Sequence, residues 1–103
     1  MNLNNAYVYI LSNKNRTVLY IGISNDLERR VAEHKSGISS GFTKKYNVSE
    51  LLYYEVFDRI TDAIQREKQL KEWKREWKIE LVKTMNLEML DLAVDWSFEI
   101  TEK

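Results

Sequence analysis

Several residue types that constrain small proteins are missing or scarce in this chain of 103 residues. It has no cysteine, no proline and only three glycines. The lack of cysteine excludes a disulfide framework and a thiolate metal site, and it is compatible with a reducing cytoplasm. No apolar run approaches the roughly 20 residues that a membrane helix needs. Residues 1–5 are polar and do not resemble a signal peptide, so we expect a soluble, cytoplasmic protein.

Charge is balanced overall but unevenly distributed. Residues 1–84 hold fifteen Lys/Arg and eleven Asp/Glu, a net charge of +4, whereas residues 85–103 hold one lysine and five acidic residues, a net charge of −4. The length is that of one domain, so we expect a single domain over 1–103 with an acidic tail from about residue 93. Two interpretations of the tail stay open, a solvated segment or one that competes with nucleic acid for the basic part.

Hydrophobic periodicity predicts an α+β, sandwich-like fold in which helices flank a small three-stranded antiparallel sheet. Strands are expected over 7–12, 17–23 and 51–57, with Leu51, Tyr53, Glu55 and Phe57 on one face. Residues 24–26 should cap a helix over 27–35 that ends at Ser36-Gly37. A loop is expected over 37–47, a long helix capped by Thr61-Asp62 and reaching Lys78 or beyond, and a short helix over 87–92. The predicted order is β-β-α-β-α-α.

Two tyrosines are expected to meet across the first two strands. A two-residue turn at Lys14-Asn15 would place Tyr9 opposite Tyr20 on the same face of the hairpin. Tyrosine is also a good strand residue, and a buried hydroxyl can simply be hydrogen-bonded within a core. A structural role therefore stays open for both side chains.

Three further residues combine polarity with a position beside apolar stripes. Arg30 and His34 lie four apart on the first helix, beside Leu27 and Val31, and Glu67 lies on the apolar stripe of the long helix. An arginine fork suits a phosphate, and a histidine can relay protons near neutral pH. A carboxylate that faces a core must be paired or bind a metal. Ion pairs of Arg30 with Asp26, Arg29 with Glu33, or Glu67 with Arg30 or a lysine are the structural alternatives.

Taken together, these residues resemble the GIY-YIG nuclease family, which includes homing endonucleases, some restriction enzymes and the incision subunit of bacterial nucleotide excision repair. The motifs that carry the resemblance are Tyr7-Val8-Tyr9, Tyr20-Ile21-Gly22, Arg30, His34 and the segment Arg66-Glu67-Lys68-Gln69-Leu70-Lys71. The resemblance is strongest to the compact, single-domain branch of the family, and it covers nearly the whole chain. Asn86 is similar in placement to a later asparagine of the fold.

The resemblance implies a one-metal phosphodiesterase that acts on DNA. Glu67 would hold Mg²⁺ or Mn²⁺, Arg30 would stabilise the transition state, and Tyr9 would act as general base with Tyr20 positioning water or phosphate. Arg29, Lys44 and Lys45 are candidates for contacts with the DNA backbone. The catalytic set is then Tyr9, Tyr20, Arg30, His34 and Glu67.

Two rival functions are compatible with the same residues. One is a nucleic-acid-binding module of the same fold with little or no catalytic activity. The other is a protein-interaction domain in which the tyrosines, Arg30 and Glu67 form a buried structural network. Metal titration separates the three, because the enzyme binds Mg²⁺ or Mn²⁺ through Glu67, the module binds DNA without metal, and the scaffold does neither.

Overall fold

The computed structural model describes residues 5–38 and 41–96 and consists of one sheet between two helical layers. The strands are β1 (Ala6–Ser12), β2 (Leu19–Ser24) and β3 (Glu50–Phe57), all antiparallel, in the order β2-β1-β3. The helices are α1 (Leu27–Ser36), α2 (Phe42–Lys45), α3 (Ile60–Lys71) and α4 (Arg75–Met85). This architecture confirms the predicted α+β class and its three-stranded antiparallel sheet.

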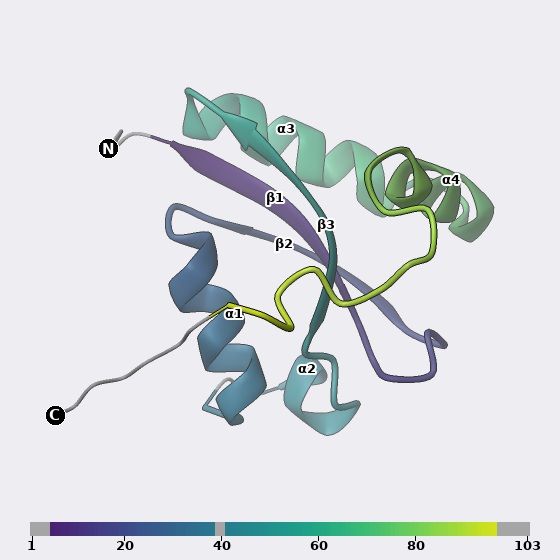
Figure 1. The fold of residues 1–103 in the computed structure, drawn as a ribbon. Helices are drawn as coiled ribbons and strands as arrows, with labels where there is room; N and C mark the ends of the chain where they lie inside the picture. Colours follow the sequence, from purple (N-terminus) through teal and green to yellow (C-terminus); the bar gives the residue numbers. More distant parts are fainter. Residues whose placement is uncertain (1–4, 39–40, 97–103) are drawn as a thin grey trace, which may run out of the picture.

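Each face of the sheet is covered by different helices (Figure 1). On one face, Leu27 and Val31 of α1 pack against Tyr9, Leu11 and Leu51. On the other face, Ala63 and Leu70 of α3 and Val82 of α4 pack against Val8, Ile10, Ile21 and Leu52. Side chains alternate between the two faces along the central strand β1. Tyr9 therefore lies on the α1 side of the sheet, and its neighbours Val8 and Ile10 lie on the α3 side.

The hairpin register differs from the predicted one. Tyr9 lies opposite Gly22, and Tyr20 lies opposite Leu11. The expected two-residue turn is wrong, because the strands end at Ser12 and Leu19 and the Asn13 side chain organises the loop between them, accepting from the backbone N–H groups of Thr17 and Val18. Because the register is shifted by two residues, both tyrosines still face the same side of the sheet.

β3 contains a bulge that also corrects a predicted face. Ile10 pairs with Tyr53 and Leu11 pairs with Leu51, which leaves Leu52 as the extra residue. Leu51 therefore faces the α1 side, whereas Tyr53 faces the α3 side, so the two do not share a face as expected. Asp91 stabilises the bulge, since its Oδ1 accepts from the backbone N–H of Leu51 at 3.0 Å.

The helices flank the sheet as predicted, but their order and bounds differ from the predicted β-β-α-β-α-α. α1 is capped as predicted by Asp26, which accepts from the Arg29 backbone N–H, and it ends at Gly37 in the left-handed conformation. The region expected as a loop over 37–47 contains the short helix α2. The N-cap of α3 is Arg59 rather than Thr61 or Asp62.

The long helix predicted to run to Lys78 is two helices. α3 ends at Lys71, and α4 begins at Arg75 after an extended Lys74. The break lets α4 turn back so that Val82 is fully buried against the α3 side of the sheet. The periodic apolar positions of this helix are Ile60, Ala63, Ile64 and Leu70. Ala63 and Leu70 are buried, as the periodicity predicts, whereas Ile60 and Ile64 are exposed.

The helix predicted over 87–92 is a loop tied down by Asn86. The Asn86 Nδ2 donates to the carbonyls of Leu52 and Leu90, and its Oδ1 accepts from the Leu90 backbone N–H. Met89 has a φ of 53°, which interrupts any helix there. Of the acidic tail expected from about residue 93, Ala93 is buried in the α1-side core, and residues 97–103 lie outside the described residues.

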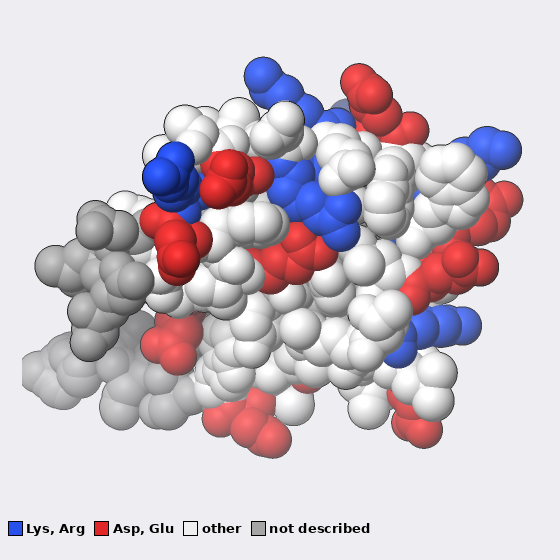
Figure 2. Space-filling view, turned by 90° about the horizontal axis from the view of Figure 1, so that it is seen from above, with Lys and Arg blue, Asp and Glu red and all other residues white. Residues whose placement is uncertain are grey.

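No helix among residues 5–38 and 41–96 combines the length and the apolar character required to cross a membrane. On the face seen from above in Figure 1, basic and acidic side chains are interspersed among uncharged surface rather than gathered by sign (Figure 2).

Candidate active site

Tyr9 is the centre of the candidate site, and Gly22 makes room for it. The Tyr9 side chain is almost fully buried and lies directly over Gly22 on the neighbouring strand. A Cβ atom added at Gly22 would come within 2.4 Å of the Tyr9 Cζ and hydroxyl oxygen, which no real contact allows. The glycine of Tyr20-Ile21-Gly22 is therefore required for space, so that the phenol can extend across the edge strand β2.

Residues from both helical layers act on the Tyr9 hydroxyl. The Arg30 guanidinium, from α1, and Glu67, from α3, are both close enough to affect the pKa of this phenol. Burial raises the pKa of Tyr9 to about 12, against the opposing effect of Arg30 and with smaller contributions from Tyr20 and Glu67. Tyr9 is therefore protonated in the free protein near neutral pH.

Tyr20 and His34 lie beside Tyr9 and form a compact ring cluster. The ring centroids of Tyr9 and Tyr20 are 6.5 Å apart, and that of His34 lies 6.2 Å from Tyr9 and 6.0 Å from Tyr20. The three rings come from β1, β2 and α1, so the sheet face and the helix meet at this point. The predicted meeting of the two tyrosines is thus present as a diagonal pair rather than a directly opposed one.

His34 is buried with one nitrogen unsatisfied. Its Nδ1 lies 3.1 Å from the Thr43 Oγ1, while its Nε2 is the buried polar side-chain atom without a hydrogen-bond partner among the described residues. Burial lowers the pKa of His34, and the positive charge of Arg30 lowers it further, so the imidazole is neutral near pH 7. An unpaired buried nitrogen is costly, and such atoms are commonly explained by a bound water, an ion or a catalytic role.

Arg30 is held by Glu33, which also pairs with Arg29. The Glu33 carboxylate lies 2.9 Å from an Arg30 nitrogen and 3.0 Å from an Arg29 nitrogen. Hydrogen bonding to Glu33, followed by that to Tyr9, raises the pKa of Arg30. Of the structural alternatives, the pair of Arg29 with Glu33 is present, but the partner of the Arg30 side chain is Glu33 and not Asp26.

Glu67 lies at the edge of the α3 stripe, with 17% of its side chain exposed. Its ion pair is with Lys71, one turn further along the helix, at 3.2 Å, and not with Arg30. The carboxylate is thus neither fully buried nor locked between several cations. Within residues 5–38 and 41–96, no three or more His, Cys, Asp or Glu side chains gather as a preformed metal cage.

The residues expected to contact nucleic acid lie around this centre. Arg29 is exposed on α1, where it is also 3.5 Å from Asp26. Lys44 and Lys45 are exposed on α2, the helix that also supplies Thr43. Sequence reasoning missed Thr43, because a single threonine in a short basic segment carries no periodic signal, and it recognised Gly22 as part of a motif without its steric role.

Asn86 lies away from the tyrosine cluster and has a structural role. All three of its side-chain hydrogen bonds are with backbone groups of β3 or of the following loop. It therefore holds the C-terminal loop against the bulge of β3.

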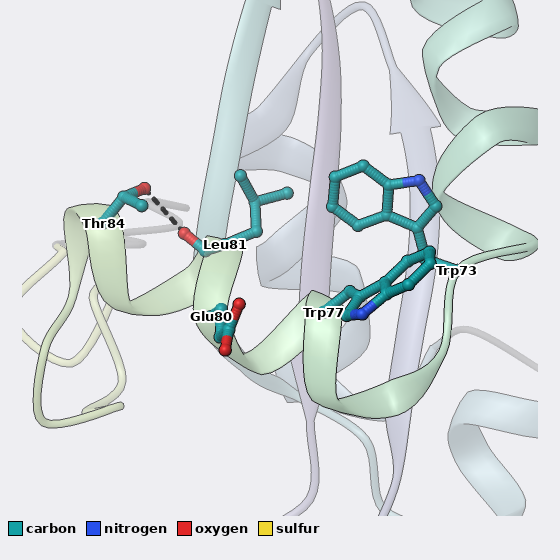
Figure 3. A pocket seen from close by; sticks show the side chains of 5 residues that line it. All are labelled: Trp73, Trp77, Glu80, Leu81 and Thr84. Atoms are coloured by element: carbon teal, nitrogen blue, oxygen red, sulfur yellow. Dashed lines mark hydrogen bonds between the residues drawn. The ribbon is translucent and has the colours of Figure 1, made fainter.

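A hollow of about 390 Å³ lies elsewhere, along α4 and the turn that precedes it (Figure 3). Its lining consists of Trp73, Trp77, Glu80, Leu81 and Thr84. The two indole rings meet edge to face, with centroids 6.1 Å apart, and the Thr84 hydroxyl donates to the Leu81 carbonyl. None of the residues in the tyrosine cluster contributes to this lining.

Comparison with known proteins identifies the family of this chain. Residues 5–80 match the model of the GIY-YIG catalytic domain. UPF0213 proteins are among the relatives: one from Natronomonas pharaonis is 42% identical over 76 residues, covering 74% of this chain and 88% of the relative. Another, from Bacillus pumilus, is 34% identical over 88 residues, covering 85% and 89%.

A solved structure gives the same result for the fold. The solution NMR structure of the UPF0213 protein BH0048 from Bacillus halodurans superposes with a TM-score of 0.52 at 30% identity, covering 80% of this chain and 86% of that chain. The matched region of the family model includes β1, β2, α1, β3 and α3, which supply the residues around Tyr9. The chain belongs to the GIY-YIG family.

Proposed function

We propose that this protein is a metal-dependent endonuclease that hydrolyses phosphodiester bonds in DNA. The observation that carries the proposal is the convergence on one hydroxyl group. Tyr9 lies within reach of Arg30 from α1 and in the field of Glu67 from α3, and it contacts Tyr20 from β2. A guanidinium, a carboxylate and two phenols at one point suit a water molecule that attacks a phosphate.

Arg30 supplies the positive charge that phosphodiester hydrolysis needs. As water attacks the phosphorus atom, negative charge grows on the non-bridging oxygens and then on the leaving oxygen. A guanidinium fixed beforehand by Glu33 donates to these oxygens without reorganisation at the moment of reaction. Tyr20, at the same face, positions the attacking water or the phosphate.

Glu67 fits the role of a ligand for Mg²⁺ or Mn²⁺. These ions keep several waters and are commonly bound by one or two carboxylates together with substrate phosphate oxygens. A single, partly exposed carboxylate with one lysine partner matches this donor set, whereas an all-protein cage is not found among the described residues. When bound, the ion would neutralise charge on the scissile phosphate.

Tyr9 is the first candidate for the general base, and His34 is positioned to assist it. With a pKa raised to about 12, the phenol alone is a scarce base at neutral pH. His34 is neutral and contacts both tyrosine rings, and its Nε2 has no protein partner in the described chain. In this proposal the Tyr9 phenol first loses its proton to the neutral imidazole of His34. The resulting phenolate then accepts the proton of the attacking water as the new P–O bond forms and the P–O bond to the leaving oxygen breaks.

The first test is a cleavage screen with labelled duplex, flap, junction and single-stranded DNA in the presence of Mn²⁺. The parent protein should cut at least one of these substrates. Glu67→Gln, which keeps the size of the side chain but removes its charge, should abolish that cleavage. Glu72→Gln, near the same helix end, is the matched control and should cut like the parent.

The outcome separates the enzyme from its rivals. If the parent and both variants bind DNA and none of them cuts it, the nucleic-acid-binding module is supported instead of the enzyme. Cleavage that persists in Glu67→Gln would remove Glu67 from the mechanism. Isothermal titration of Mn²⁺ into the parent and Glu67→Gln reports the metal site independently of cleavage, and equal binding by both would place the metal elsewhere.

A further inference from the structure

A continuous series of aromatic rings leads from the candidate active site to the protein surface. The ring of Phe42 is stacked on that of Tyr20, with centroids 6.2 Å apart and planes 22° from parallel. The ring of Tyr46 follows, 4.8 Å from Phe42 and tilted by 46°. Phe42 and Tyr46 are four residues apart at the two ends of α2, so both project from the same side of this short helix.

The two outer rings are exposed although α2 is firmly anchored. Phe42 is 49% exposed and Tyr46 is 42% exposed. On the opposite side of α2, Thr43 is buried against His34, and its carbonyl accepts from the Val48 backbone N–H at 2.8 Å. The helix thus holds two large rings in water at a defined distance from Tyr20, which costs hydrophobic free energy unless a partner covers them.

The charges around the rings indicate the chemistry of that partner. Lys44 and Lys45 are exposed on the same helix, and the Lys45 Nζ lies 5.3 Å from the centroid of the Tyr46 ring. α2 carries no acidic residue. Exposed aromatic faces flanked by lysines are the combination that binds single strands, because bases stack on the rings while the cations follow the phosphates.

We propose that Phe42 and Tyr46 form a stacking platform for unpaired DNA bases, so that the substrate is single-stranded, or has an unpaired stretch, beside the scissile phosphate. The position of that phosphate rests on the function proposed above for Tyr9 and Arg30. In a continuous duplex each base is already stacked on both faces and cannot lie on Phe42 without being extruded. An unpaired strand offers a free base at no such cost.

Binding in EDTA tests the platform without any contribution from cleavage. The probes are fluorescein-labelled oligothymidylate of 15 nucleotides and a blunt duplex with the same number of phosphates, measured by fluorescence anisotropy. The double variant Phe42→Leu, Tyr46→Leu keeps apolar surface but loses both ring faces. It should bind the single strand about five- to a hundredfold more weakly, and the duplex within about twofold of the parent.

Two controls make the result specific to stacking. Phe42→Trp supplies a larger ring face and should bind the single strand at least as tightly as the parent. Trp77→Leu removes an aromatic side chain of the same 49% exposure on α4 and should leave binding unchanged. Circular dichroism spectra and Tm values of all variants confirm that α2 and the site around His34 remain folded.

Several outcomes would contradict the proposed stacking role of Phe42 and Tyr46. Unchanged affinity of the double variant for the single strand is one, and an equal loss for duplex and single strand is another, because the effect would then be general. Tighter, ring-dependent binding of oligouridylate would assign the platform to RNA, and a change of oligomeric state with unchanged DNA affinity would assign it to a protein partner. If the platform fails while Glu67-dependent cleavage persists, the proposed function stands; if no nucleic acid is bound or cut, both fail.

Discussion

Two clusters of tyrosine, arginine and glutamate occur on opposite faces of the same sheet. On the α3 side, the Tyr53 hydroxyl donates to Glu55 at 2.6 Å, and Arg66 donates to both oxygens of the same carboxylate at 2.9 Å. On the α1 side, Arg30 acts on the Tyr9 hydroxyl and His34 Nε2 has no partner in the described chain, while Glu67 acts on the same hydroxyl electrostatically from α3. The residue types are the same, but their hydrogen bonding differs.

The difference concerns the phenolic proton. Burial and the Glu55 carboxylate raise the pKa of Tyr53, and the hydroxyl proton is already donated to that carboxylate. Arginine can only donate hydrogen bonds, so the interaction of Arg30 with Tyr9 leaves the phenolic proton available. A satisfied network rigidifies the fold, whereas an incompletely satisfied one offers groups to a substrate. We therefore interpret the first cluster as structural and the second as functional.

The largest expected effects come from removing one carboxylate charge on each side. Glu67→Gln should abolish cleavage with an unchanged or slightly raised Tm, because it removes a partly buried charge with a single lysine partner. Glu55→Gln should retain cleavage but lose about 1 to 3 kcal/mol of stability, because Arg66 loses its bidentate partner. Thermal unfolding and cleavage assays on both variants check this. A sharp fall in Tm for Glu67→Gln would mark it as a structural ion-pair partner.

Gly22→Ala should be nearly as severe for cleavage. The new Cβ atom occupies the position of the Tyr9 ring and must displace it, and a displacement of about 1 Å can cost about a hundredfold in rate. A double-mutant cycle with Tyr9→Leu measures the steric clash directly through the free energy of unfolding. The loss of stability from Gly22→Ala should largely disappear in the Tyr9→Leu background. Additive effects would contradict the proposed role of Gly22.

Arginine-to-lysine substitutions sharpen the comparison further. Arg30→Lys keeps the charge but loses the planar fork, so turnover should fall about ten- to a thousandfold, corresponding to about 1.4 to 4 kcal/mol of transition-state stabilisation. Arg66→Lys should instead lower the Tm and leave turnover unchanged, since its fork binds Glu55. Steady-state cleavage kinetics and thermal unfolding measure the two effects. Unchanged turnover in Arg30→Lys would remove this arginine from the mechanism.

The smallest expected effect is a pH dependence of stability from His34. Its pKa is lower in the folded protein than the ordinary value of 6.5, so the unfolded chain binds more protons between the two values and stability rises with pH there. The stabilisation is present above about pH 6.5 and is lost as pH falls towards the folded pKa. The Tm of the parent should decrease between pH 7.5 and 5.5, and His34→Gln should decrease less. Parallel curves for the two proteins would show that another group causes the dependence.

The sequence was sufficient for the faces of the hairpin and for the first helix. Tyr9 and Tyr20 share a face in either register, because side chains alternate with a period of two and the register differs by two residues. Asp26 and Gly37 bound α1 through local chemistry that can be read from sequence. Once the bounds of α1 are known, Arg30 and His34, four residues apart, must lie on the same side of this helix.

Features that depend on tertiary contacts were not predictable in this way. The break at residues 72–74 contains neither proline nor glycine, and Trp73, Trp77 and Leu81 continue a helical period through it. The break coincides with the burial of Val82 against the sheet, a tertiary contact that the local pattern does not indicate. Likewise, the bulge in β3 depends on Asp91, forty residues away, and the helical appearance of residues 87–92 is overridden by the three backbone bonds of Asn86.

We expect the anchoring of the C-terminal loop to β3 to limit self-association of the protein. β3 is an edge strand of eight residues, and such strands recruit other chains through their unpaired backbone groups. Here the Leu51 N–H donates to Asp91, and the Leu51 carbonyl accepts from the Leu92 N–H at 2.7 Å. The loop therefore occupies the backbone groups at which a foreign strand would begin to pair. A chain that ended before Asp91 would expose these backbone groups. Pairing of β3 with the β3 strand of another copy would then compete with folding.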